Sequence, residues 1–249
     1  MTAAVHPAPA VTHDPAHTPS AASRIWGTVR IQYLNRYTFV WIPLIILASA
    51  VAVSIAIYAM IGADQPMYGG AVQAPLWYFV AAGAQAMSLT FPFAQALTVT
   101  RREFFLGTAL AALISAGGLS LVFVVLGYIE QATNGYGVNG YISHLPWVWE
   151  QGGVVAGLLY LVLTLLVFFV GFWMATLYRR GGALVVTLAA IGLGILVVGT
   201  LFVITRFELW GDVVRVFAEA GPLGVTGVLC VLVALAALAG WLTLRRSPP

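Results

Sequence analysis

The stretch LTVTRREFFLGTAL, residues 97–110, places two arginines and a glutamate between two long apolar runs. An arginine at the centre of a bilayer costs at least about 2.5–3.5 kcal/mol, so Arg101 and Arg102 mark a point where the chain leaves hydrocarbon. Thr100 precedes Glu103 by three residues, which is the spacing of a helix-starting capping box. The stretch therefore predicts that one membrane helix ends just before Thr100 and that another begins at Arg101.

The composition of the 249-residue chain is that of an integral membrane protein. Hydrophobic residues make up 61% of the sequence and charged residues only 8%, whereas a soluble domain carries about 25% charged residues. So few polar side chains cannot cover the surface of a soluble domain. The net charge of +3 comes from eleven arginines and no lysine. Because no basic patch interleaved with aromatic residues lies outside the apolar runs, we expect no nucleic-acid partner.

Six apolar runs follow one another along the chain, each near the roughly 20 residues that cross a ~30 Å hydrocarbon layer. Hydrocarbon offers the backbone no hydrogen bonds, so each run is predicted to be a helix. The runs do not alternate in polarity as the strands of a membrane β-barrel do. The predicted fold is all-α, with six transmembrane helices. They are expected at Phe39–Ile61, Leu76–Leu97, Phe104–Ile129, Val154–Tyr178, Ala183–Ile204 and Leu223–Leu244.

Nine of the eleven arginines fall on one side of these predicted spans. Short loops rich in arginine stay in the cytoplasm. We therefore expect both termini in the cytoplasm and a multi-pass protein of the cell's inner, or plasma, membrane. The cytoplasmic set is Arg24, Arg30, Arg36, Arg101, Arg102, Arg179, Arg180, Arg245 and Arg246, and the outer set is Arg206 and Arg215.

The chain divides into three predicted segments. Residues 1–23 are rich in Pro, Ala, His and Thr without periodicity, which predicts a disordered cytoplasmic tail and no signal peptide. Residues 24–38 mix arginines with apolar and aromatic side chains, which is typical of an amphipathic helix in the headgroup layer. Residues 39–246 form the transmembrane domain. No folded context fixes the geometry of the tail histidines, so we favour a flexible tail over a metal site. They are His6, His13 and His17.

A longer motif surrounds the opening stretch. FPFAQALTVTRREFFLGTAL, residues 91–110, combines a Pro-Phe stretch, a small polar run, Thr-Arg-Arg, an aromatic pair and Leu-Gly-Thr. With the six spans and the entry helix, this order resembles the permease subunit of a type-2 ATP-binding-cassette exporter, most closely the short permeases common in actinobacteria. MATLYRRGG, residues 174–182, resembles the corresponding cytoplasmic turn between spans 4 and 5 of that group.

The resemblance implies roles and partners. In such exporters the turn between spans 2 and 3 is a coupling helix that docks on a separate ATPase subunit. The chain would form a homodimer or a heterodimer with a second permease, lie in membrane lipid, and export an amphiphilic or hydrophobic substrate. On the residues alone, an ordinary turn anchored by arginines remains the alternative. The residues implied to contact the ATPase are Thr100, Arg101, Arg102, Glu103 and Phe104.

The chain lacks the lysine that a phosphate-binding loop, G-x-x-x-x-G-K-[S/T], requires. We therefore expect no enzyme activity and no cofactor in this chain, with ATP and Mg bound by the partner ATPase.

The second predicted span carries a polar face. Gln85, Ser88, Pro92 and Gln95 recur at spacings of three and four, so they share one side of the helix. Glutamines within a span face protein or water rather than lipid. This face either lines a translocation path at a dimer seam or joins helices by hydrogen bonds, and the sequence leaves both open. Pro92 is expected to kink the span.

Two features are expected on the outer side. FELWGDVVRVFAEAG, residues 207–221, predicts an amphipathic helix. By resemblance it is an external gating helix, and the alternative is a passive interfacial anchor. In the loop before span 4, His144 and Glu150 are candidates for a proton site, but simple solvation is favoured. The gating residues would be Phe207, Trp210, Asp212, Arg215 and Phe217.

Two rival functions remain: a non-transporting membrane protein such as a sensor or assembly factor, and a lipid-modifying membrane enzyme. The predicted spans contain no carboxylate, histidine or Ser-His-Asp set, which argues against a proton-coupled carrier and an intramembrane hydrolase. The single cysteine, Cys230, lies within the last span and cannot form an intrachain disulfide.

Overall fold

The structure is a computed structural model that describes residues 20–34, 36–71 and 73–245. The predictions for residues 1–19, with the three histidines, and for Arg246 lie outside these described residues. Helices dominate the described chain. Its only strands are β1 (Met67–Tyr68) and β2 (Gly140–Tyr141), which form a short parallel pair.

Four helical stretches of the described chain are long and apolar enough to cross a membrane, which supports the predicted membrane-embedded, all-α class. These are Tyr37–Ile61, Arg101–Ala132, Gly153–Arg206 and Trp210–Arg245. The α-helices are α1 (Ala21–Gln32), α2 (Ile42–Ile61), α3 (Gln73–Gln85), α4 (Phe91–Ala96), α5 (Arg101–Ala132), α6 (Pro146–Trp149), α7 (Gly153–Arg206) and α8 (Trp210–Arg245), with π-helical segments η1 (Tyr37–Trp41), η2 (Ala86–Thr90) and η3 (Gly135–Asn139).

Two of the long helices are broken by glycines. At 1.5 Å per residue, the 54 residues of α7 would extend about 80 Å, far beyond a ~30 Å hydrocarbon layer. The break falls at Gly182, whose φ of 66° and ψ of −166° suit glycine almost exclusively. Gly221 breaks α8 in the same way, with φ 61° and ψ −176°. The chain therefore turns at Gly182, between the predicted fourth and fifth spans.

The stretch from α3 to α4 is helical throughout, but its middle is the π-helical segment η2. Pro92 lies two residues beyond this segment and has no backbone N–H to offer the carbonyl of Ser88, one turn earlier. The kink expected at Pro92 stays a prediction, and the π-helical segment is a separate irregularity that precedes the proline.

The buried core joins α3, α5 and the first half of α7. Two glycines bring α3 and α7 into backbone contact: a Cβ added at Gly83 would clash with the carbonyl oxygen of Phe168, and one at Gly171 with that of Val80. Close approach through small residues is the usual way in which membrane helices pack. The largest side chains sealed in this core are Phe79, Met87, Phe91, Phe104, Phe123, Phe168 and Phe172.

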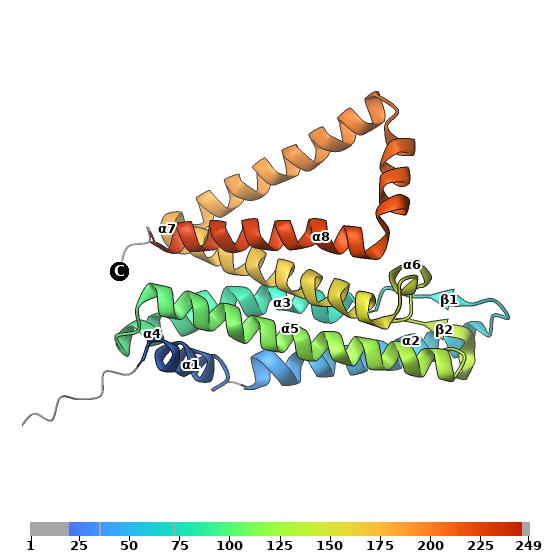
Figure 1. Cartoon of the computed structure of the whole chain (residues 1–249), viewed down its shortest axis with the longest axis horizontal. Coiled ribbons are helices and arrows are strands. Elements are labelled where there is room, and N and C mark those ends of the chain that lie inside the picture. Colours follow the sequence, from blue (N-terminus) through green and yellow to red (C-terminus); the bar gives the residue numbers. More distant parts are fainter. Residues whose placement is uncertain (1–19, 35, 72, 246–249) are drawn as a thin grey trace, which may run out of the picture.

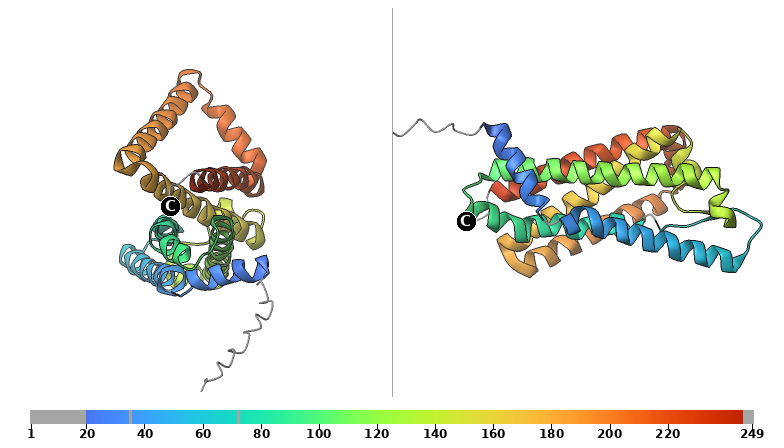
Figure 2. Two further views of the ribbon diagram at one scale, coloured as in Figure 1. Left: turned by 90° about the vertical axis from the view of Figure 1, so that its left-hand side faces the viewer. Right: turned by 90° about the horizontal axis from the view of Figure 1, so that it is seen from below.

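The second half of α7 and the beginning of α8 swing away from this bundle and enclose an open triangle with the rest of α8 (Figure 1). None of residues 177–220 is buried. In the opposite part of the molecule, α1 lies across the bundle's long axis, while α2 and α5 run along it (Figure 2). The predicted interfacial helix at 24–38 is shorter than expected, because α1 ends at Gln32 and η1 already begins the next helix at Tyr37.

Candidate functional site: the turn between α4 and α5

The turn that joins α4 to α5 is short and exposed. Leu97, Thr98 and Thr100 are all exposed. Thr98 has a φ of 59°, a left-handed conformation that is strained for a β-branched residue, and its hydroxyl donates to the carbonyl oxygen of Leu97 at 2.7 Å. Such a conformation persists only where the surrounding structure holds it.

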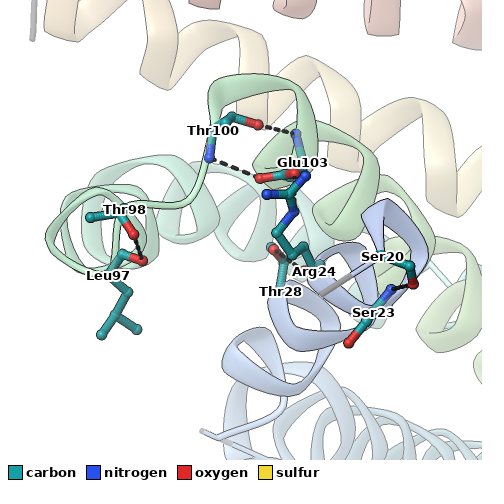
Figure 3. Close-up of polar contacts among 8 residues, drawn as sticks. All are labelled: Ser20, Ser23, Arg24, Thr28, Leu97, Thr98, Thr100 and Glu103. Atoms are coloured by element: carbon teal, nitrogen blue, oxygen red, sulfur yellow. Dashed lines mark hydrogen bonds and ion pairs between the residues drawn. The ribbon is translucent and has the colours of Figure 1, made fainter. Parts of the chain in front are cut away.

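The predicted capping box is confirmed. The hydroxyl of Thr100 accepts a hydrogen bond from the backbone N–H of Glu103 at 3.3 Å, and the carboxylate of Glu103 accepts one from the backbone N–H of Thr100 at 3.1 Å (Figure 3). The two bonds satisfy donors that a helix start otherwise leaves unpaired. They fix the residue at which α5 begins.

Glu103 also joins the turn to α1. Its carboxylate lies 2.7 Å from the Nε of Arg24, and its side chain is only 10% exposed, compared with 50% for Arg24 (Figure 3). A carboxylate that is almost fully withdrawn from water needs such partners. The glutamate therefore ties the entry helix to the first turn of α5.

Arg101 joins the turn to the end of the chain's last helix. Its Nη1 donates to the carbonyl oxygens of Arg245 at 2.9 Å and Leu244 at 3.4 Å. These carbonyls end α8, where intrahelical partners run out and a positive charge is favourable. The side chain of Arg101, from α5, thus caps the carboxyl-terminal end of α8.

Phe104 anchors the turn from within the bundle. It is fully buried and packs edge to face on Phe91 of α4, with ring centroids 4.9 Å apart. The guanidinium of Arg179, a residue of α7, lies 5.4 Å from the centre of the Phe91 ring. The turn is therefore connected to α1, α4, α7 and α8, while Thr98, Thr100 and Arg102 remain exposed among the described residues.

The five residues expected to contact an ATPase take different positions. Thr100 and Arg102 are exposed, whereas Glu103 and Phe104 face inward and Arg101 is engaged with α8. A side chain that is fully buried cannot touch a partner in this conformation. Phe104 therefore supports the turn, and Arg102 is exposed and forms no ion pair with the residues that the structure describes.

The four residues of the predicted polar face of span 2 have different surroundings. Gln85 accepts a hydrogen bond from the hydroxyl of Thr38 at 3.4 Å, so it faces η1. Ser88 donates to the carbonyl oxygen of Ala84 within its own helix, while Pro92 is exposed and Gln95 is half-buried. At Gln85, the observed contact is one of helix packing.

Most of the amphipathic segment predicted at residues 207–221 lies in the first part of α8, which begins at Trp210. The Nη2 of Arg215 lies 2.9 Å from the Oδ1 of Asp212, and its Nε lies 3.9 Å from the Oε1 of Glu219. The apolar side chains Phe207, Trp210 and Phe217 are exposed. Trp210 and Phe217 line a groove against Trp147 and Glu150. His144 and Glu150 are not joined to each other by any hydrogen bond among the described residues; instead Nε2 of His144 lies 2.6 Å from Nε2 of Gln131.

A buried carboxylate near the carboxyl-terminal end of α5 was missed by the sequence reasoning. Glu130, one residue beyond the predicted span, is 0% exposed. It accepts hydrogen bonds from the backbone N–H groups of Ile142, Ser143 and His144 at 3.1, 2.9 and 2.7 Å, and from the hydroxyl of Tyr136 at 3.2 Å. A carboxylate directly after an apolar run and before a glycine-rich loop was the available signal.

Burial and the negative charge of Glu130 raise the pKa of Tyr136 well above its usual value. The phenol therefore stays protonated and keeps donating to the carboxylate. Loop residues 142–144 are held from a second side, because the carbonyl oxygen of Ser143 accepts from Trp149 Nε1 and from the Tyr160 hydroxyl.

Comparison of the chain with protein-family models, with curated proteins and with solved structures found no match.

Proposed function

We propose that the chain is the permease subunit of a type-2 ATP-binding-cassette exporter, driven by a separate ATPase that docks on the turn between α4 and α5. In this proposal the chain crosses the plasma membrane six times, with α3–α4 and the two halves of α7 among the spans and both termini in the cytoplasm. It pairs with a second permease and moves an amphiphilic or hydrophobic substrate outward.

The observation that carries the proposal is the way in which the turn is connected. An exposed arginine, Arg102, stands on a turn that is linked by an ion pair to α1, by hydrogen bonds to the end of α8 and by aromatic packing to α4. A rigid element with these links transmits a displacement to several helices at once.

The test is whether the purified chain binds an ATP-binding-cassette ATPase subunit and stimulates its ATP hydrolysis; a neighbouring gene is the first place to seek that subunit. Arg102→Glu is expected to reduce stimulation about tenfold, because a reversed charge opposes an interface that selects a cation. Arg180→Glu is the matched control, since Arg180 is an exposed arginine outside this turn, and it should change stimulation less than twofold.

Both variants must elute as folded protein in detergent. A chain that neither binds such an ATPase nor alters its turnover would exclude the exporter function. Equal effects of the two substitutions would instead remove Arg102 from the docking surface.

A further inference from the structure

A groove of about 250 Å³ lies between α1, η1 and η2. Its polar lining residues are Gln32, Thr38, Gln85 and Thr90, and none of the described residues that line it is charged. Apolar side chains complete its walls. Leu34 and Leu89 are 77% and 68% exposed, so the groove opens between side chains that can lie in the acyl region of a bilayer.

Two π-helical segments meet at this groove. Thr38 and Phe39 come from η1, and Ala86, Leu89 and Thr90 come from η2. A π-helical turn holds an extra residue, is less favourable than an α-helical one, and occurs frequently at functional sites. Both irregular turns therefore contribute to the same recess.

The groove wall contains an unsatisfied acceptor. Gln32 is 2% exposed, and its Nε2 donates to the hydroxyl of Thr108 at 2.8 Å. Its Oε1 is buried and has no hydrogen-bond partner among the described residues. Buried carbonyl oxygens are nearly always paired, so an orphan beside a recess points to a donor that is supplied from outside the chain.

A second glutamine that lines the groove, Gln85, can supply a donor. The Oε1 of Gln85 accepts from the hydroxyl of Thr38, which leaves the Nε2 of Gln85 without an acceptor among the described residues. An orphan acceptor and a free donor together match a hydroxyl group, which both donates and accepts. Because charged side chains are lacking from the described lining, an ionic headgroup is not favoured.

We propose that this groove binds a membrane lipid with a neutral, hydroxyl-bearing headgroup, of the kind that diacylglycerols and glycolipids carry. Pockets for whole small molecules measure about 300–1,000 Å³, so this smaller recess takes the headgroup and the first part of the chain. The remaining chain lies over Leu34 and Leu89. This inference depends on the membrane embedding of the chain and not on the exporter function.

The experiment uses the full chain in phosphatidylcholine nanodiscs with a diacylglycerol that carries a photoreactive diazirine near the headgroup. Cross-linked peptides are then mapped by mass spectrometry. Labels are expected within residues 31–39 and 85–93, and an analogue with an acetylated hydroxyl should label them about fivefold less, in line with the loss of one hydrogen bond. An excess of free glycerol should not compete, because a soluble polyol lacks the chain.

Gln32→Met and Thr108→Val form a matched pair. Both substitutions remove the hydrogen bond between α1 and α5, but only Gln32→Met removes the groove's acceptor. Gln32→Met should reduce labelling about fivefold, and Thr108→Val should leave it within twofold. Leu89→Trp, which fills the opening, should reduce it further.

Labelling spread evenly over the exposed apolar surface, including residues 183–206, would overturn the proposal. So would equal labelling by the acetylated analogue, or equal losses in Gln32→Met and Thr108→Val. If free glycerol alone displaced the photoreactive diacylglycerol, the groove would be a site for a soluble polyol, and the lipid proposal would be wrong.

Discussion

Glu130 and Glu103 stand near opposite ends of α5, and each carboxylate organises the segment beside it. Glu103 was predictable, because its spacing from Thr100 is a local signal that needs no knowledge of the rest of the fold. Its ion pair with Arg24 was not, since the sequence does not tell which side of α5 receives α1. Glu130 was missed because three of its four donor groups are backbone N–H groups, and any residue type except proline can supply these.

At the same scale, Glu130→Ala should release the loop at residues 142–144. The substitution removes the acceptor of the backbone N–H groups of Ile142, Ser143 and His144, at a cost of about 1–3 kcal/mol for each group that water does not reach. Hydrogen exchange at these three amides is expected to rise by at least about tenfold. Glu150→Ala, which removes an exposed carboxylate, is the control and should leave the exchange unchanged. Unaltered exchange in Glu130→Ala would contradict the anchoring role.

The two residues of the ion pair between α1 and α5, Arg24 and Glu103, should differ in importance. Arg24 is half exposed, so Arg24→Gln is expected to cost at most about 1 kcal/mol. Glu103→Ala loses the ion pair and half of the capping box, which adds about 0.5–2 kcal/mol. Thermal unfolding in detergent should therefore show a larger loss for Glu103→Ala. An equal loss would mean that the capping box contributes nothing to stability.

At the scale of elements, the apolar runs predicted where the helices lie, but not how they join. The predicted boundary between spans 4 and 5 falls at Gly182, and residues 73–96 are helical as expected. The π-helical segments η1 and η2 were not predicted, because the extra residue in each turn follows from packing around it. The sequence also does not tell which glycines lie at a close helix contact. Gly171 lies against the backbone of α3, while Gly192 has no neighbour within 4 Å of an added Cβ.

This contrast gives a paired prediction. Gly171→Ala places a methyl group against the backbone of Val80 and should destabilise the bundle by about 1–3 kcal/mol or more. Gly192→Ala meets nothing within 4 Å and should stabilise its helix by up to about 1 kcal/mol, the usual gain from replacing a helical glycine. Midpoints of thermal unfolding in the same detergent measure both. A neutral Gly171→Ala would contradict the close packing of α3 and α7.

At the scale of the whole molecule, the turn between α4 and α5 lies at one end of the long axis, beside the end of α8, and α6 with the strand pair lies at the other (Figure 1). The arginine count predicts that the first end is cytoplasmic. The open arrangement of residues 177–220 was not predictable, because an apolar helix that faces lipid or a partner has the same composition as one that faces its own bundle.

The orientation is tested with a membrane-impermeant maleimide in a Cys230→Ser background. Glu208→Cys, at the exposed junction of α7 and α8, should react in intact cells. Thr98→Cys, on the turn between α4 and α5, should react only after the membrane is permeabilised. The reverse pattern would invert the topology and remove the turn from the reach of a cytoplasmic ATPase.

The capping of α8 by Arg101 also bears on how the chain is best handled in the laboratory. The carbonyl oxygens that Arg101 holds belong to Leu244 and Arg245. A fluorescent reporter or purification handle joined directly after Arg245 would therefore begin next to the Arg101 side chain, at the turn between α4 and α5. Activity of such a fusion is best compared with that of the untagged chain.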